Sequence, residues 1–83
     1  MNEITHETKE KIMTKAERRA RFLISNRSMK QLVADFEATE TNNDPYIYMV
    51  RGWIMDELEN RDAEAFDKWI DSNEESPRKF YLK

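Results

Sequence analysis

The densest hydrophobic stretch of the chain is Tyr46–Val50, and hydrophobic residues continue beyond it at helical spacing. One broad helix face would carry Tyr46, Ile47, Val50, Trp53, Ile54 and Leu58. Tyr48 and Met55 fall almost opposite that face, so only a narrow polar strip remains. A helix that is apolar nearly all round is typical of the centre of a helical domain or of an oligomer interface. We therefore expect this helix to organise the rest of the chain.

The boundaries of this central helix follow from its flanking residues. Asp44 suits the N-cap and Pro45 suits the first helical position, where a missing N–H costs nothing. At the other end, residues 60–62 predict a tight bend. Tyr46–Val50 also has strand propensity, and Gly52 would weaken a helix by up to about 1 kcal/mol. Because no partner strand is visible elsewhere, the pattern favours one continuous helix.

Three further segments have the pattern of amphipathic helices. The first is expected over residues 8–25 and the second over residues 28–41, where Ser28 and Gln31 have the form of a capping box. The last, short helix is expected to begin at Asp62 and to end near Ser72. The expected inward faces carry, in turn, Ile12, Met13, Ala16, Ala20, Leu23 and Ile24; Met29, Leu32, Val33 and Phe36; and Ala63, Phe66, Trp69 and Ile70.

These patterns predict an all-α protein, a small three- to four-helix bundle with a central third helix. We expect a disordered N-terminus over residues 1–8, a helical domain over residues 9–73 and a flexible tail over residues 74–83. Whether residues 80–82 dock on the domain stays open at the level of the sequence. One Gly and two Pro among 83 residues are too few turn formers for an all-β fold.

Composition narrows the classes of function. The chain has no Cys, its one His is His6 in the expected disordered start, and it has no Gly-rich phosphate loop. We therefore expect a non-enzymatic protein with no catalytic residue, no metal site and no cofactor. Neither a signal peptide nor a membrane span is visible, which predicts a cytoplasmic protein without membrane contact.

The charge is uneven along the chain and singles out the first helix. Residues 1–30 carry eight Lys or Arg against four Glu, whereas residues 31–83 carry six against thirteen Asp or Glu. One side of the first helix carries the stripe Lys11, Lys15, Arg18 and Phe22. Nucleic-acid binders combine cations with rings in this way. Alternatively, Phe22 packs under a neighbouring helix and the cations are simply solvated. Because the net charge is −3, nucleic acid is the second choice of partner.

A second candidate surface, for contact with a protein, lies on the central helix and consists of Tyr48, Arg51 and Met55. Arg51 either lays its stem on apolar neighbours or presents its guanidinium to an acidic partner. Glu57 falls inside the apolar face, where an unpaired carboxylate is costly. Its simplest partner is Arg61, four residues later, and Arg19 is another candidate.

Three segments carry a resemblance to a known group of proteins, namely Ser28–Glu37, Val50–Glu59 and Ala65–Ile70. Over roughly residues 16–71 the chain resembles small uncharacterised helical proteins from prophages and mobile elements of Gram-positive bacteria. The resemblance implies no particular activity and no site residues. It does imply a small accessory protein that acts on host or element machinery by stoichiometric binding.

Together these observations predict a small non-enzymatic protein–protein interaction module, a phage or mobile-element accessory or host-modulating protein. Its partner would be an unknown protein, a second copy in a homodimer, or both. The alternative is an accessory nucleic-acid-binding protein that uses the basic first helix.

Overall fold

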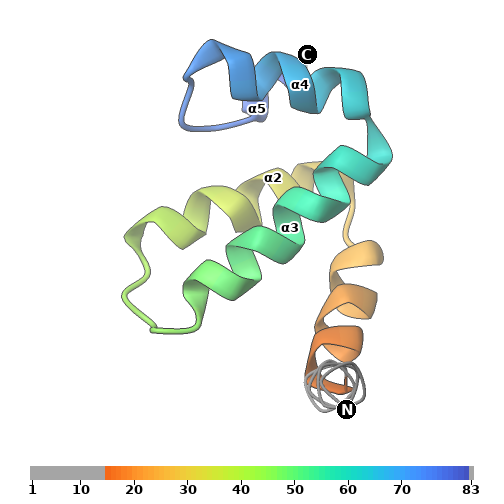
Figure 1. The fold of residues 1–83 in the computed structure, drawn as a ribbon, viewed down its shortest axis with the longest axis vertical. Coiled ribbons are helices and arrows are strands. Elements are labelled where there is room, and N and C mark those ends of the chain that lie inside the picture. Colours follow the sequence, from red (N-terminus) through yellow and green to blue (C-terminus); the bar gives the residue numbers. More distant parts are fainter. Residues whose placement is uncertain (1–14, 83) are drawn as a thin grey trace, which may run out of the picture.

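A computed structural model of the protein describes residues 15–82, which form helices joined by short loops and no β-strand. Residues 15–25 are helical and are called the N-terminal helix below. The elements that follow are α2 (Met29–Ala38), the 3-10 helix η1 (Thr39–Thr41), α3 (Ile47–Arg61), α4 (Ala63–Ser72) and α5 (Arg78–Tyr81) (Figure 1). The expected all-α class is confirmed. The expected disordered start, residues 1–8, lies outside the described residues.

Two of the expected helix caps are confirmed. The Gln31 amide donates to the Ser28 hydroxyl at 3.1 Å, and the Ser28 amide donates to the Gln31 side chain at 3.0 Å, which completes the capping box of α2. The Asp62 carboxylate accepts a hydrogen bond from the Ala65 amide at 3.0 Å and caps α4. Asp62 is also the residue that ends α3, so it sets the bend between the two helices.

The helix α3 is continuous through Gly52, as the hydrophobic pattern favoured. It begins at Ile47 and not at Pro45, because the Asp44 carboxylate accepts from the Tyr46 amide at 2.8 Å and closes a turn first. α2 and α3 run side by side in opposite directions, and α3 also contacts η1 and α4 (Figure 1). This placement gives α3 neighbours along its whole length.

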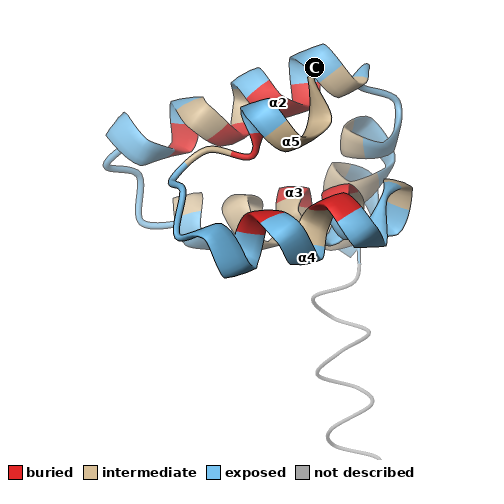
Figure 2. Ribbon diagram, turned by 90° about the horizontal axis from the view of Figure 1, so that it is seen from above, coloured by how far each residue is buried: buried red, intermediate tan, exposed pale blue. Residues whose placement is uncertain are grey.

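The buried core combines Leu32, Val33 and Phe36 from α2, Ile54 and Leu58 from α3, and Ala65 and Trp69 from α4. In Figure 2 the buried positions of α2 face those of α3 and α4. The Trp69 ring meets Phe36 edge-on with 5.0 Å between ring centroids. Its indole N–H donates to the Glu74 carbonyl at 2.8 Å. Full burial of a Leu, Ile, Val or Phe side chain contributes roughly 1.5–3 kcal/mol each, so this layer stabilises the fold substantially.

The inward face of α4 differs from the expected one. Ala65 and Trp69 are buried, whereas Ala63 is exposed and Ile70 is 48% exposed. The expectation that Ala63 and Ile70 face inward is therefore wrong. Ala65 and Trp69 lie four residues apart on one helical stripe, and Ile70 follows Trp69 by about a quarter of a turn. Because that stripe packs toward Phe36, Ile70 is turned toward solvent.

The C-terminal segment packs on the core, which differs from the expected flexible tail over residues 74–83. Pro77 is buried, and Phe80, Tyr81 and Leu82 contact the core cluster. The Arg78 guanidinium donates to the Glu37 carboxylate at 2.6 and 2.9 Å, and the Ser76 hydroxyl donates to the same group at 2.7 Å. The hydrogen bonds from Arg78, and to a smaller extent the one from Ser76, lower the pKa of Glu37 to about 2. These bonds join residues about forty positions apart, which no local pattern reveals.

Tyr81 gives this docked segment a pH dependence. Its hydroxyl donates to the Leu58 carbonyl at 2.8 Å and lies 3.1 Å from the Asp62 carbonyl. Burial, with help from Asp62 and two further carboxylates, raises the pKa of Tyr81 from 10.0 to about 12. Because the pKa of Tyr81 is higher in the folded than in the unfolded protein, its protonated hydroxyl stabilises the fold. This contribution to the free energy of unfolding is complete below pH 10 and is lost as the pH rises through 12.

We therefore expect Tyr81→Phe to lower the free energy of unfolding by about 1 kcal/mol at neutral pH, because it removes a hydrogen bond. Above pH 10 the wild type should lose stability faster than the variant, so the two curves converge. Urea unfolding followed by circular dichroism at several pH values measures this. A constant gap between the two proteins across that range would contradict the assigned role of the hydroxyl.

Candidate interaction site on the N-terminal helix

Arg61 attaches the N-terminal helix to the rest of the protein. Its guanidinium donates to the carbonyls of Ile24 and Ser25 at 3.3 Å and of Arg27 at 2.8 Å. The first two lie at the C-terminal end of the helix, where a cation is favourable, and the Ile24 carbonyl also accepts from the Arg27 amide at 3.0 Å. Its Nε donates to Glu57 at 2.8 Å, so the expected Glu57–Arg61 pair is confirmed. One half-buried arginine thus ties residues 24–27 to the end of α3.

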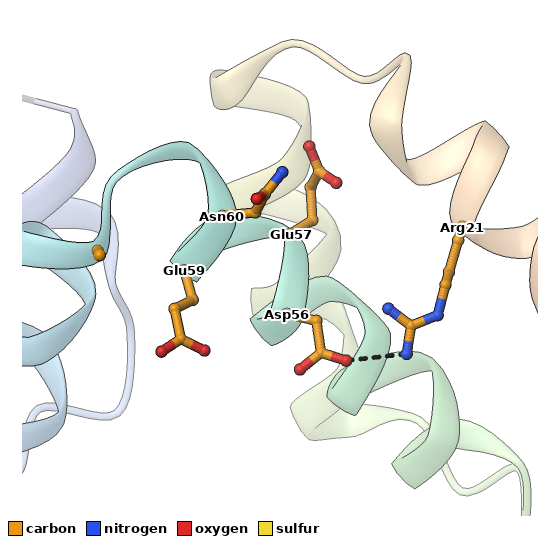
Figure 3. Close-up of a pocket in the computed structure, with 6 residues that line it drawn as sticks. Arg21, Asp56, Glu57, Glu59 and Asn60 are labelled. Atoms are coloured by element: carbon orange, nitrogen blue, oxygen red, sulfur yellow. Dashed lines mark hydrogen bonds and ion pairs between the residues drawn. The ribbon is translucent and has the colours of Figure 1, made fainter.

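A second attachment lies one turn earlier. The Arg21 guanidinium donates to Asp56 at 2.9 Å and to Glu17 at 2.6 Å. Figure 3 shows Arg21 and Asp56 reaching toward one another between the N-terminal helix and α3. The hydrogen bond to Asp56, and to a smaller extent the one to Glu17, raises the pKa of Arg21. Together with Ile24, which contacts the core cluster, these residues define the side of the helix that faces α3.

The outer side of the N-terminal helix presents a basic-aromatic face. Lys15, Arg18, Arg19 and Phe22 together line one open depression. The three cations are exposed, and Phe22 is 65% exposed. The structure therefore brings together three of the four residues of the predicted stripe. The fourth, Lys11, lies outside the described residues.

The ion pairs of the protein set this face apart. None of Lys15, Arg18 and Arg19 pairs with a carboxylate of residues 15–82. The cations that do pair within that range are Arg21, Arg27, Arg51, Arg61, Lys68, Arg78 and Lys79. Arg19 belongs to the face, although the sequence suggested it only as a possible partner of Glu57, which pairs with Arg61 instead. Its position three residues before Phe22 was the signal that could have included it.

This arrangement suits binding rather than bond chemistry. Arginine and lysine side chains attract carboxylates or phosphates, and an exposed ring adds apolar contact or stacking. Within residues 15–82 no group of three His, Asp or Glu side chains is placed to hold a metal ion. In the same range no helix is long and apolar enough to cross a membrane.

The second predicted surface does not form one exposed face. Tyr48 is 80% exposed, but the Arg51 guanidinium lies 4.5 Å over the Phe36 ring and 3.5 Å from Glu40. Met55 packs against the core cluster. Arg51 fits neither expected arrangement fully, because its guanidinium, and not only its stem, contacts Phe36, Thr39 and Glu40 of the same chain. The reason is η1, which brings Glu40 beside α3 and was not expected as a separate element.

The N-terminal helix also buries less of its apolar side than its sequence pattern indicates. Ile24 contacts the core cluster, whereas Ala16 is exposed and Leu23 is 57% exposed. Arg21 and Glu17 occupy part of the side toward α3 instead. The helix is thus rotated relative to the expected packing, and part of its apolar stripe faces solvent.

Comparisons with protein-family models, with curated proteins and with solved structures found no match to this chain. The resemblance to prophage and mobile-element proteins therefore stays a prediction.

Proposed function

We propose that this protein is a small non-enzymatic protein–protein interaction module that binds its partner through the basic-aromatic face of the N-terminal helix. The observation that carries the proposal is the exposure of Phe22 among Lys15, Arg18 and Arg19 around one depression. Aromatic residues and arginine dominate the energetics of protein interfaces. The core formed by α2, α3 and α4 does not use this side of the helix, so it is available to a partner.

The chemistry of the face defines the partner. It would be an acidic surface with an apolar side chain that covers the Phe22 ring. Complementary charge would speed the encounter, and the ring would contribute most to the lifetime of the complex. From the resemblance stated above, we place this partner in the machinery of a bacterial host or mobile element, in the cytoplasm.

A nucleic acid is the second candidate partner for the same face. The specific observation in its favour is a ring beside several cations, which is the combination that single-stranded nucleic acids bind. The acidic remainder of the chain speaks against it, because residues 28–82 carry six Lys or Arg against thirteen Asp or Glu. Protein is therefore the first choice.

A pair of charge-reversed variants tests the proposal. Lys15→Glu combined with Arg18→Glu removes charge from the face, and Lys30→Glu combined with Lys68→Glu makes the same change in net charge elsewhere. Wild type and the control should retain the same protein from a lysate of cells that carry the gene. The face variant should retain at least roughly tenfold less of this partner protein, because complementary charges are replaced by repulsive ones. Circular dichroism confirms that both variants are folded.

Fluorescence anisotropy with a single-stranded RNA and a DNA duplex decides between the two partners. If three cations of the face contact phosphates of a duplex, raising the salt concentration from 50 to 200 mM should weaken binding about 40-fold. Salt-sensitive binding that the face variant loses would replace protein by nucleic acid as the partner. A partner retained equally by the face variant and the control would overturn the proposal for both classes.

A further inference from the structure

An apolar groove lies between α2 and α3, where the N-terminal helix joins them. Its volume is about 280 Å³. The α3 side is formed by Ile47, Val50 and Ile54, which follow one another at the spacing of a single helix face. The full lining is Ile24, Asp35, Ala38, Thr39, Asn42, Ile47, Val50 and Ile54. Asp35 is the one charged residue among them, and its carboxylate already accepts from the Arg27 guanidinium at 2.8 and 2.9 Å, so the groove offers mainly apolar contacts.

The N-terminal helix presents an exposed apolar side that could occupy such a groove. Leu23 is 57% exposed, Ala16 is exposed and Ala20 is half-buried, and the three share one helix face. Arg19 lies beside them, four residues before Leu23, and it pairs with no carboxylate of residues 15–82. This side is distinct from the one that carries Phe22. The same protein thus holds an open apolar groove and an exposed apolar helix side.

The charges of the two parts are complementary. Residues 15–27 carry five Lys or Arg and one Glu. Residues 28–82 carry six Lys or Arg and thirteen Asp or Glu. Asp35 in the groove is already paired with Arg27 of its own chain, whereas the exposed Asp44 lies two residues after the lining residue Asn42. A basic helix from a second copy would therefore meet an acidic body, whereas two bodies alone would repel each other.

The positions of the two surfaces allow a symmetric exchange. Ile24 closes the groove and belongs to the N-terminal helix, and Ala20 joins Ile24 to the Leu23 side. Groove and helix side are therefore neighbours on one molecule. A two-fold axis near Ile24 would let each copy insert its helix into the groove of the other, as a closed two-fold interface requires.

We propose that a second copy of this chain occupies the groove with the Leu23 side of its N-terminal helix, so that the protein is a two-fold dimer. The inference goes beyond the proposed function, because it names a partner for another side of the same helix. Lys15, Arg18 and Phe22 stay open in the dimer, and Arg19 lies at the border between the two sides. Dimerisation would bury Leu23 and Ala16 against Ile47 and Val50, which are half-buried in the single chain, whereas Ile54 below them is already only 2% exposed.

Sedimentation velocity of the full chain from low micromolar to millimolar concentration tests self-association. Leu23→Glu changes the inserted helix, and Ile47→Glu changes the groove at a half-exposed position in the first turn of α3. Each should weaken the dimer by roughly tenfold or more, since each places a carboxylate in an apolar contact. Ile70→Glu is the matched control, because Ile70 is exposed on α4 and lies outside the groove. The control should dimerise like the wild type.

Cross-linking locates the interface, since the chain has no Cys of its own. An Ala16→Cys protein is mixed with an Ile47→Cys protein under oxidising conditions, and any mixed disulfide must join two copies. We expect this disulfide, and we expect none between Ala16→Cys and Ile70→Cys proteins.

A wild type that is monomeric at every concentration would overturn the dimer. A dimer that both glutamate variants leave intact, or that gives no mixed disulfide, would overturn the proposed surfaces. Neither result affects binding through the Phe22 face, which the Lys15 and Arg18 variants measure separately. Conversely, loss of that binding with an intact dimer would remove the proposed function alone.

Discussion

Replacement of Trp69 by alanine should lower the free energy of unfolding by about 3–5 kcal/mol, the largest effect expected from a single substitution in this protein. The Trp69 side chain is 4% exposed, packs edge-on against Phe36 and Phe66, and donates its N–H to Glu74. Truncation would leave a cavity where α2 and α4 meet. Because a domain of this size has a total stability of roughly 5–10 kcal/mol, this substitution would remove a large part of it.

The chain offers a matched control in its other tryptophan. Trp53 is half-buried and lies outside the buried core cluster, so Trp53→Ala should cost less than half as much. Trp69→Phe should fall between, because it keeps a ring but loses the bond to Glu74. Urea unfolding followed by far-ultraviolet circular dichroism measures all three. Equal losses for the two alanine variants would show that Trp69 does not centre the core.

Replacement of Arg61 by alanine should release the N-terminal helix at a cost of about 2–3 kcal/mol. The substitution removes the donor to the carbonyls of Ile24, Ser25 and Arg27, and it leaves Glu57, whose side chain is only 19% exposed, without its cation. A half-buried carboxylate without a partner adds to the loss. Amide hydrogen exchange should accelerate over residues 22–27 more than in α2.

Two further variants separate attachment from general destabilisation. Arg61→Lys should give a partial effect, because a single ammonium can stay near Glu57 but does not reach several carbonyls in a fixed geometry. Arg51→Ala removes another arginine, whose cation–π contact, ion pair and hydrogen bond join it to Phe36, Glu40 and Thr39. It should leave exchange at residues 22–27 unchanged. If Arg61→Ala also left it unchanged, Arg61 would not be the anchor of that helix.

The sequence predicted the local features well, because they depend on residues a few positions apart. The Ser28–Gln31 capping box, the Asp62 cap and the Glu57–Arg61 pair all form within one helical turn or a single bend. Helix type and approximate bounds follow from the same short-range pattern, and so does the burial of Leu32, Val33 and Phe36 in α2.

For the candidate site, the sequence placed Lys15, Arg18 and Phe22 on one side of a helix but did not indicate whether that side is exposed. Lys15, Arg18 and Phe22 share a helix face in any helix with this spacing. Whether a neighbouring helix covers that face depends on how the helix is rotated when it packs. Arg21 and Arg61 decide this through contacts with Asp56 and with the end of the helix, thirty or more residues away in the chain.

The helix around Tyr46–Val50 shows the same division most clearly. Its sequence determined a continuous helix through Gly52, since the spacing of residues along a helix acts locally. Only the tertiary structure decided that Met55 and Arg51 are used within the protein, that Tyr48 is exposed, and that Ile47 lines a groove. The physical reason is that burial depends on the surface offered by other elements. Here those elements are η1 and α2, whose placement beside α3 is a property of the whole chain.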